Sequence, residues 1–323
     1  MTAGTFLQNN NRSRSVLFLF KILISGMILF LLVQKISLPG LLHAVKSADN
    51  KFIAAALFLM PLNMFLQYSK WRLVVCQFNP DEKPGIVLSS LLFGILFGLV
   101  TPGRIGDYAR TLFIDNVEKT ELLGLFLVDK VITLFVIYFL GALGLLQFVS
   151  VLTQSVILSI VIGLGLVFVV TGFVLYRRGF RFQPQNWNYL KKINFLLHLF
   201  KGMSQISHSL VRKLGVLTFI HVFTYCTQLY LLISAFHSVS FVNAMSAAFA
   251  VMFTKSVLPI SFGDLGVREG AAVYFFGRFG VSSPASFNAS LLLFLINILI
   301  PGLIGIVVFL LRRHLFIKGE QNA

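Results

Sequence analysis

The stretch Leu99-Val-Thr-Pro-Gly-Arg-Ile-Gly-Asp-Tyr-Ala-Arg110 breaks an apolar segment that runs over residues 84–116. Proline and glycine interrupt a helix, and charged side chains follow this break directly. Each half of the segment has only about 12–18 residues, whereas a helix needs roughly 20 to cross a bilayer. The pattern therefore predicts a hairpin of two half-helices instead of a transmembrane span.

A second broken segment, residues 241–279, repeats the pattern 160 residues later. It is apolar up to residue 258, is interrupted by proline and glycine, and then becomes charged. Gly103-Arg-Ile-Gly106 and Gly263-Asp-Leu-Gly266 share the pattern G-x-[IL]-G. Each follows a hydroxyl residue, Thr101 or Ser261, that stands two positions before its first glycine. This correspondence predicts an internal repeat.

The composition indicates a membrane protein. Of the 323 residues, 57% are apolar and only 12% are charged, about half the charged share of a soluble domain. This excludes a disordered chain and argues against a soluble enzyme. The 27 lysines and arginines outnumber the 11 acids and give a net charge of +16. Because these basic residues flank membrane-length apolar runs, we expect loops that face anionic headgroups, and no nucleic-acid partner.

Six apolar segments are long enough to cross a bilayer as helices. Basic clusters orient them: the tail 1–15, the acid-free loop 177–213 and the tail 312–323 are expected in the cytoplasm. The first segment follows arginines, as a signal peptide does, but no small-residue cleavage site follows it, so we interpret it as an uncleaved helix. The predicted spans are residues 16–34, 52–78, 121–148, 152–176, 214–236 and 285–311.

Helix parity then fixes the direction of the two broken segments. The scheme closes only if 84–116 enters and leaves from the cytoplasm and 241–279 enters and leaves from the outside. We therefore predict an all-α polytopic membrane protein with two inverted-topology repeats, residues 16–148 and 152–311, comprising six full spans and two re-entrant helical hairpins. Such repeats with broken helices are a transporter architecture, in which substrate binds where the breaks meet.

Irregular backbone at membrane depth must line a cavity or be buried, because lipid cannot satisfy its N–H and C=O groups. Each break is expected to start a half-helix, near Pro102 and near Phe262, whose free N–H groups attract phosphate. Hydroxyls can cap these starts, glycines allow close approach, arginines bind phosphate, and acids can pair with arginine or receive a cationic headgroup. The predicted substrate-binding residues are Thr101, Gly103, Arg104, Asp107, Arg110, Lys255, Ser261, Gly263, Asp264, Arg268 and Glu269.

The same charges also have a structural interpretation. Arg104 and Asp107 have the i, i+3 spacing of an internal ion pair, which would make their burial tolerable. Arg268 could hold helices together, and Lys255 could extend into a water-filled vestibule.

Two further charged groups lie at or within the predicted spans. We expect Asp129-Lys130 to form a structural pair near the cytoplasmic interface. We expect Lys70-Trp71-Arg72, near the inner end of span 52–78, to be an interfacial anchor.

The two glycine-containing stretches resemble the lysylphosphatidylglycerol synthase transmembrane (flippase-like) family, above all in Gly263-Asp-Leu-Gly-Val-Arg-Glu-Gly-Ala271. The resemblance extends over roughly residues 15–312 and implies lipid translocation in a bacterial inner membrane. In the best-understood relatives, an attached synthase domain makes the transported aminoacylated phosphatidylglycerol. This chain departs from the pattern at Phe262-Gly263-Asp264, where a second glycine is expected, and it ends at Ala323 without a synthase domain.

We therefore expect a flippase or scramblase for an anionic phospholipid or lipid-linked headgroup, and not an enzyme. The chain has no ATP-binding G-x-x-x-x-G-K-[ST] motif, so movement should be passive, gradient-driven or coupled to another protein. Its cysteines and histidines show no metal-ligand spacing, and we expect no cofactor. The alternatives are a non-transporting partner of a separately encoded lipid-modifying enzyme, an integral membrane transferase, and a small-solute transporter of the same architecture.

Overall fold

The chain is described by a computed structural model that covers residues 46, 48–99, 101, 104–148, 194–258 and 265–321. Every regular element in these ranges is helical. In chain order they are α3 (Asn50–Val75), α4 (Pro84–Leu99), η1 (Ile105–Phe113), α5 (Lys119–Leu145), η2 (Leu146–Phe148), α8 (Asn194–Ser204), α9 (His208–Ser234), α10 (Phe241–Val257), α11 (Val267–Gly277), α12 (Ser283–Phe294), η5 (Leu295–Leu299) and α13 (Ile300–Gln321).

Four of these helices are long and apolar enough to cross a membrane, which makes the protein a multi-pass membrane protein. They are α3, the continuous helix α5–η2, α9, and the rod that runs from α12 through η5 to Leu311. They confirm the predicted spans 52–78, 121–148, 214–236 and 285–311. The other two predicted spans, 16–34 and 152–176, lie outside the described residues, as does the tail 1–15.

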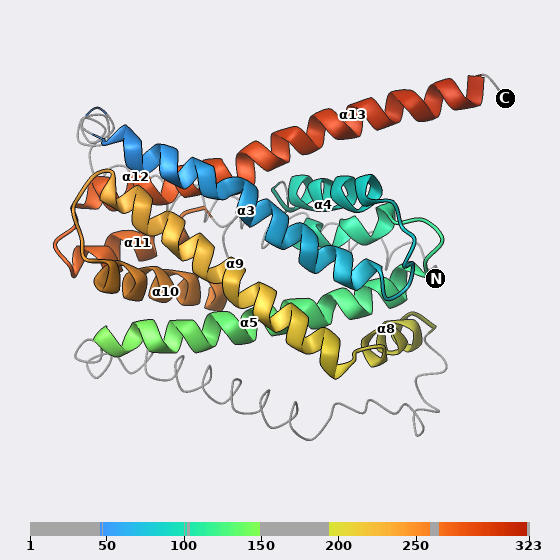
Figure 1. The fold of residues 1–323 in the computed structure, drawn as a ribbon, viewed down its shortest axis with the longest axis horizontal. Helices are drawn as coiled ribbons and strands as arrows, with labels where there is room; N and C mark the ends of the chain where they lie inside the picture. The colour runs from blue at the N-terminus through green and yellow to red at the C-terminus, as the bar shows by residue number, and fades with distance from the viewer. Residues whose placement is uncertain are drawn as a thin grey trace, which may run out of the picture.

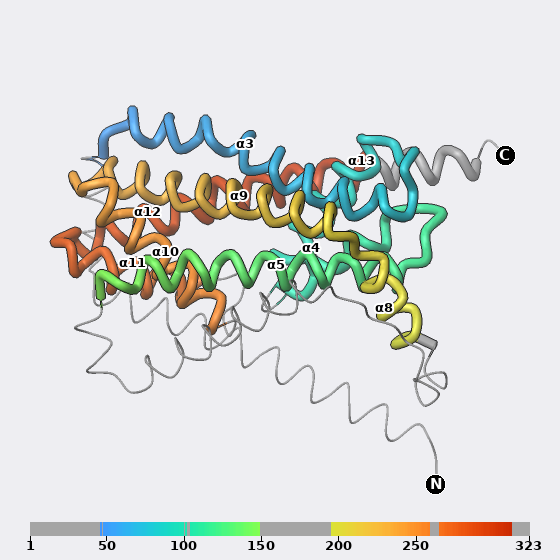
Figure 2. The backbone as a smooth tube through the Cα atoms, turned by 60° about the horizontal axis from the view of Figure 1, so that its bottom comes forward, coloured from blue at the N-terminus to red at the C-terminus, as the bar shows by residue number. Residues whose placement is uncertain are grey.

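The long helices lie side by side and alternate in direction (Figures 1 and 2). Helix α3 and the α12–α13 rod run one way along the bundle, and α5 and α9 run the other way. The broken segment α4–η1 lies in the half of the bundle where α3 ends. The broken segment α10–α11 lies in the opposite half, next to the start of α12. Each broken segment thus enters and leaves at one end, and the two ends are opposite.

The second half of the first hairpin is not the α-helix predicted to start near Pro102. It is the 3-10 helix η1, whose N-cap Arg104 adopts a left-handed conformation with φ 56°. Thr101 does not cap a helix there. Its hydroxyl donates to the carbonyl of Phe97 at 2.8 Å and accepts the Gly106 N–H at 2.7 Å, which ties η1 back to α4. The tighter 3-10 turn results because these bonds fold the chain back within a few residues.

The second hairpin does continue as an α-helix, but this helix starts later than predicted. Helix α11 begins at Val267 and not near Phe262. Its N-cap is Gly266, whose φ of 92° is accessible to glycine and strained for other residues.

Two buried apolar clusters hold the bundle together. One joins α9, α10, α11 and α12 to the second half of α5. The other joins the ends of α3 and α4 to the first half of α5 and surrounds Trp71, which is 2% exposed. Each hairpin is thus packed against α5 by a core of its own, and α5 spans both.

Candidate functional site

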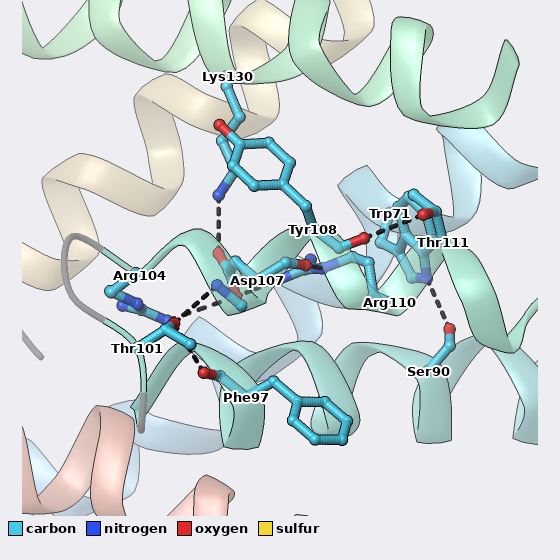
Figure 3. Close-up of polar contacts among 11 residues, drawn as sticks. Trp71, Ser90, Phe97, Thr101, Arg104, Asp107, Tyr108, Arg110, Thr111 and Lys130 are labelled. Carbon is cyan, nitrogen blue, oxygen red and sulfur yellow. Dashed lines mark hydrogen bonds and ion pairs between the residues drawn. The ribbon is translucent and has the colours of Figure 1, made fainter. Parts of the chain in front are cut away.

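The first hairpin carries a group of four charged side chains, Arg104, Asp107, Arg110 and Lys130, which we call the first-hairpin cluster (Figure 3). Asp107 Oδ1 lies 2.7 Å from Arg110 Nη2 and 3.7 Å from Arg104 Nη2. Its other oxygen, Oδ2, accepts a hydrogen bond from Lys130 Nζ at 2.8 Å. One carboxylate is therefore shared by three cations, and Lys130 comes from a different element, α5.

Backbone geometry positions this cluster on α4. A Cβ atom added to Gly106 would lie 2.1 Å from the carbonyl oxygen of Phe97, so only glycine permits this approach of η1 to α4. Asp107 is the next residue, and its N–H donates to the Arg104 carbonyl at 3.0 Å. The predicted i, i+3 pairing of Arg104 with Asp107 is confirmed, and the structure adds Arg110 and Lys130 to the same carboxylate.

Aromatic rings form one wall of the cluster. The Arg110 guanidinium lies 4.8 Å from the ring centre of Phe126 and 5.6 Å from that of Trp71. The Lys130 ammonium lies 4.9 Å from the Phe126 ring centre. Trp71 is fixed in turn, because its indole N–H donates to Ser90 Oγ at 2.8 Å. These ring faces help to stabilise cations away from water.

The structure differs from two expectations for α3 and α5. Of Lys70, Trp71 and Arg72, which were expected to form an interfacial anchor, Lys70 and Trp71 are buried inside the protein and only Arg72 is exposed. Lys70 Nζ lies 3.0 Å from Asp129 Oδ1 and donates to Thr133 Oγ1 at 2.9 Å. Asp129 and Lys130 do not pair with each other, because adjacent helical residues point in different directions. Asp129 binds α3, whereas Lys130 binds the first hairpin.

Exposure distinguishes the members of the first-hairpin cluster. The side chains of Lys130 and Arg104 are 34% and 23% exposed, whereas those of Arg110 and Asp107 are 6% and 7% exposed. Even if only Arg110 and Lys130 are counted, two cations share one carboxylate. The cluster therefore combines a buried carboxylate and a buried arginine with two partly exposed cationic side chains.

The second hairpin places Arg268 and Glu269 in a closed environment. The side chains of Arg268 and Glu269 are both 0% exposed and form an ion pair. The Arg268 guanidinium also donates to Ser290 Oγ at 3.0 Å and to the Tyr225 hydroxyl at 3.4 Å. It lies 5.5 Å from the ring centre of Phe294. One arginine thus joins α11 to α9 and α12.

The start of α11 is already capped. Glu269 Oε2 accepts the Gly266 N–H at 2.6 Å, so this helix terminus holds a carboxylate of its own chain. Lys255, at the end of α10, lies with its ammonium 5.7 Å from the Tyr225 ring centre. Of the residues predicted around the two breaks, Gly103, Ser261, Gly263 and Asp264 lie outside the described residues.

A third polar group, which the sequence analysis missed, joins three long helices. Asn63 of α3 donates to Gln228 of α9 and, at 3.1 Å, to Asn297 Oδ1 in the π-helical turn η5. Asn297 donates to Gln228 Oε1 at 2.9 Å, and Gln228 donates to the Ala56 carbonyl at 2.8 Å. We call Asn63, Gln228 and Asn297 the amide triad. The sequence did offer one signal for this group, since each of three predicted spans contains one of these amide side chains.

Among the described residues, no group of three or more histidine, cysteine or acidic side chains could hold a metal ion.

The sequence pattern of the family described as the lysylphosphatidylglycerol synthase TM region matches residues 18–305. The match covers most of the chain, so the chain belongs to this family, as its glycine-containing stretches indicated. No curated protein matches the chain.

Proposed function

We propose that this member of the lysylphosphatidylglycerol synthase TM region family moves an anionic phospholipid or lipid-linked headgroup between membrane leaflets. The observation that carries the proposal is the first-hairpin cluster, in which Asp107 is shared by Arg104, Arg110 and Lys130. Charges inside a membrane protein are costly and usually face a partner or a pathway. An anion that supplies the missing negative charge would therefore be stabilised there.

Phosphate is the natural anion for this cluster. Arginine offers it a planar pair of donors, and lysine adds a flexible third. The partly exposed side chains of Arg104 and Lys130 can contact a headgroup while Arg110 stays buried. The capped start of α11 argues that these cations, and not a free half-helix terminus, make the main contact with the phosphate. This revises the contact expected from the sequence alone.

The proposed transport cycle uses the arrangement of the broken helices. We infer two inverted repeats whose hairpins enter from opposite membrane faces, with both chain termini in the cytoplasm of a bacterial cell and the protein in the inner membrane. Rocking of one repeat against the other would expose the headgroup to each leaflet in turn, while the lipid tail stays in the bilayer. The lipid is chemically unchanged, so the chain acts as a transporter and not as an enzyme.

Leaflet exchange in liposomes tests the proposal. Purified protein is reconstituted in phosphatidylcholine vesicles that carry fluorescent phosphatidylglycerol, and exchange is followed by quenching of the outer leaflet. We expect exchange above that of empty vesicles, and about a tenfold loss for Arg104→Gln, the cost of one charge-assisted contact. Arg278→Gln is the matched control, because Arg278 is exposed at the end of α11 and its guanidinium contacts Tyr274, away from the first-hairpin cluster.

The outcomes separate the alternatives. No exchange by folded wild type for any anionic lipid would reject autonomous transport and favour a partner of a separately encoded lipid-modifying enzyme. A change in lipid mass during the assay would favour a transferase. Equal losses for Arg104→Gln and Arg278→Gln would remove the first-hairpin cluster from the transport site.

A further inference from the structure

We propose that Lys130 is a headgroup-binding residue that exchanges partners: Asp107 holds it in the resting protein, and the phosphate of the lipid takes it over during binding. This inference rests on the proposed function and names a residue that the sequence analysis assigned to a structural pair. Asp107 then acts as an internal competitor, which stays paired with the Lys130 ammonium until a phosphate replaces it.

The carboxylate is divided so that this exchange is possible. Oδ1 of Asp107 faces Arg110 at 2.7 Å and Arg104 at 3.7 Å, whereas Oδ2 faces Lys130 at 2.8 Å. If Lys130 leaves, Asp107 keeps a short charge-assisted hydrogen bond to Arg110. The departure of Lys130 therefore does not leave a buried carboxylate without a counter-charge, which is the costly event in a low-dielectric interior.

Arg110 is held by more contacts than Lys130. The Arg110 Nε also donates to the backbone carbonyl of Asp107 at 3.0 Å, and its side chain is 6% exposed between Trp71 and Phe126. Lys130 donates a hydrogen bond to Asp107 and lies over the Phe126 ring, but its side chain is 34% exposed and its four-carbon stem is flexible. The lysine is therefore the more exposed and the less tightly held of the two cations.

The neighbouring ion pair, Lys70 with Asp129, shows what a buried lysine–aspartate pair looks like in this protein. Lys70 lies 3.0 Å from Asp129, bonds Thr133 as well, and is 8% exposed. Asp129 and Lys130 are adjacent on α5, so the two pairs share one helix and one depth along it. The two lysines differ in exposure, 8% for Lys70 and 34% for Lys130, whereas the two carboxylates are both buried. Asp129 is therefore the control for Asp107.

A competing carboxylate has a use in transport. A carrier must bind its cargo strongly enough to take it up and weakly enough to release it on the other side, as ion pathways also require. A carboxylate 2.8 Å from the lysine lowers the affinity of this site for phosphate. When the lipid leaves, the carboxylate forms its ion pair with the lysine again. Exposed Ile105 and Leu112 on the same 3-10 helix supply apolar surface beside the cluster, which suits a phosphate attached to a lipid tail.

The test measures binding and exchange separately in five proteins. Wild type, Asp107→Asn, Lys130→Gln, the double variant that combines these two changes, and the control Asp129→Asn are placed in phosphatidylcholine nanodiscs, and short-chain phosphatidylglycerol is titrated by calorimetry. A parallel titration uses inorganic phosphate. Leaflet exchange of fluorescent phosphatidylglycerol is measured with the same proteins in vesicles.

We expect Asp107→Asn to bind phosphatidylglycerol about tenfold more tightly and to exchange it more slowly, because removing one charge-assisted competitor shifts affinity by roughly that factor. Lys130→Gln should bind about tenfold more weakly, and the double variant should lose the gain seen in Asp107→Asn. Asp129→Asn should bind like wild type. If inorganic phosphate binds more weakly than phosphatidylglycerol but ranks the variants in the same order, the lipid is the ligand. If the two bind equally tightly, free phosphate is the ligand.

Several results would overturn the inference. It fails if Asp107→Asn does not tighten binding, or if Asp129→Asn tightens it equally, since net charge alone would then explain the effect. If Asp107→Asn does not fold, Lys130→Gln and Lys130→Arg decide: binding lost in the first and kept in the second supports the exchange, and unchanged binding in Lys130→Gln rejects it. Expected binding without any leaflet exchange would reject transport and leave the Lys130 site standing.

Discussion

The two hairpins share a glycine pattern but use their charges in opposite ways. In the first, three cations surround one carboxylate, and the side chains of Arg104 and Lys130 are partly exposed. In the second, one arginine, Arg268, pairs with one carboxylate, Glu269, and both side chains are fully buried. The shared G-x-[IL]-G pattern therefore marks where a helix breaks. The balance and exposure of the neighbouring charges indicate which break can hold an anion.

The difference arises from what completes each break. Glu269 in the second hairpin bonds the Gly266 N–H and its neighbour Arg268, so one carboxylate balances both the positive start of α11 and the arginine within one turn. In the first hairpin, the hydroxyl of Thr101 satisfies the backbone at Gly106, which leaves Asp107 to the side chains around it. We infer that the second hairpin belongs to the fixed frame and the first carries the binding site.

The largest predicted effect comes from alanine at the buried arginine of the frame. Arg268→Ala removes the counter-charge of a fully buried carboxylate, Glu269, and should destabilise the protein by about 3–5 kcal/mol. Arg110→Ala should cost less, about 1–3 kcal/mol, because Lys130 and Arg104 still face Asp107. Thermal unfolding in detergent, followed by circular dichroism, compares the two variants.

A double variant checks that charge, and not lost volume, causes this loss. Arg268→Met with Glu269→Gln removes both charges and should recover much of the stability, since replacing a whole buried pair is often nearly neutral. Equal unfolding temperatures for Arg268→Ala and Arg110→Ala would contradict the division into frame and site.

The second glycine of each motif tests the same division at the level of the backbone. Gly106→Ala forces a Cβ against the Phe97 carbonyl and should cost about 3 kcal/mol. Gly266→Ala meets a φ of 92° and should cost about 1–3 kcal/mol. Only Gly106→Ala should also weaken phosphatidylglycerol binding, because it moves Asp107. Calorimetric titration of both variants measures this, and a binding loss in Gly266→Ala alone would reverse the assignment.

Local spacing was enough to predict part of this site. The i, i+3 interval between Arg104 and Asp107 places both on one turn whether the helix is α or 3-10. Lys130 could not be found in that way, because its contact with Asp107 spans 23 residues and depends on how α5 packs against η1. The fold was predictable in its spans and breaks for the described residues, since bilayer thickness fixes helix length.

The errors have a physical cause as well. Lys70 and Trp71 stand near the end of a span, where basic and aromatic residues normally mark the membrane interface. The first hairpin packs beside that end and buries both, which no local pattern reveals. The amide triad was missed for the same reason, since Asn63 and Asn297 are 234 residues apart in sequence.

A smaller effect is expected at the amide triad, which belongs to the frame. Gln228→Leu keeps the side-chain volume but removes the bonds to Asn63, Asn297 and the Ala56 carbonyl. The expected cost is about 1–2 kcal/mol, in the lower part of the range for unpaired buried groups, because Asn63 and Asn297 retain their own bond. The unfolding temperature should fall while phosphatidylglycerol affinity stays unchanged. A variant with normal stability and altered affinity would place the triad in the binding site instead.

The smallest effect concerns α8, which lies beside the start of α5 at the end of the bundle where the first hairpin opens (Figure 1). Lys201 Nζ lies 2.8 Å from Glu121 Oε1, and this hydrogen bond raises the pKa of Lys201 above its ordinary value. A raised lysine pKa means that the contact stabilises docking of α8 below the ordinary pKa of about 10.4 and is lost as the pH rises through the raised pKa.

Spin labels at exposed Ser204 and Asp115 should therefore show one distance from pH 7 to 10, and the distribution of distances should broaden only at higher pH. Lys201→Arg should keep the single distance at pH 11, because arginine stays charged. Spreading at pH 8 in the wild type would show that Lys201 does not hold α8, and would favour His198, whose Nδ1 lies 3.0 Å from the same Glu121 oxygen.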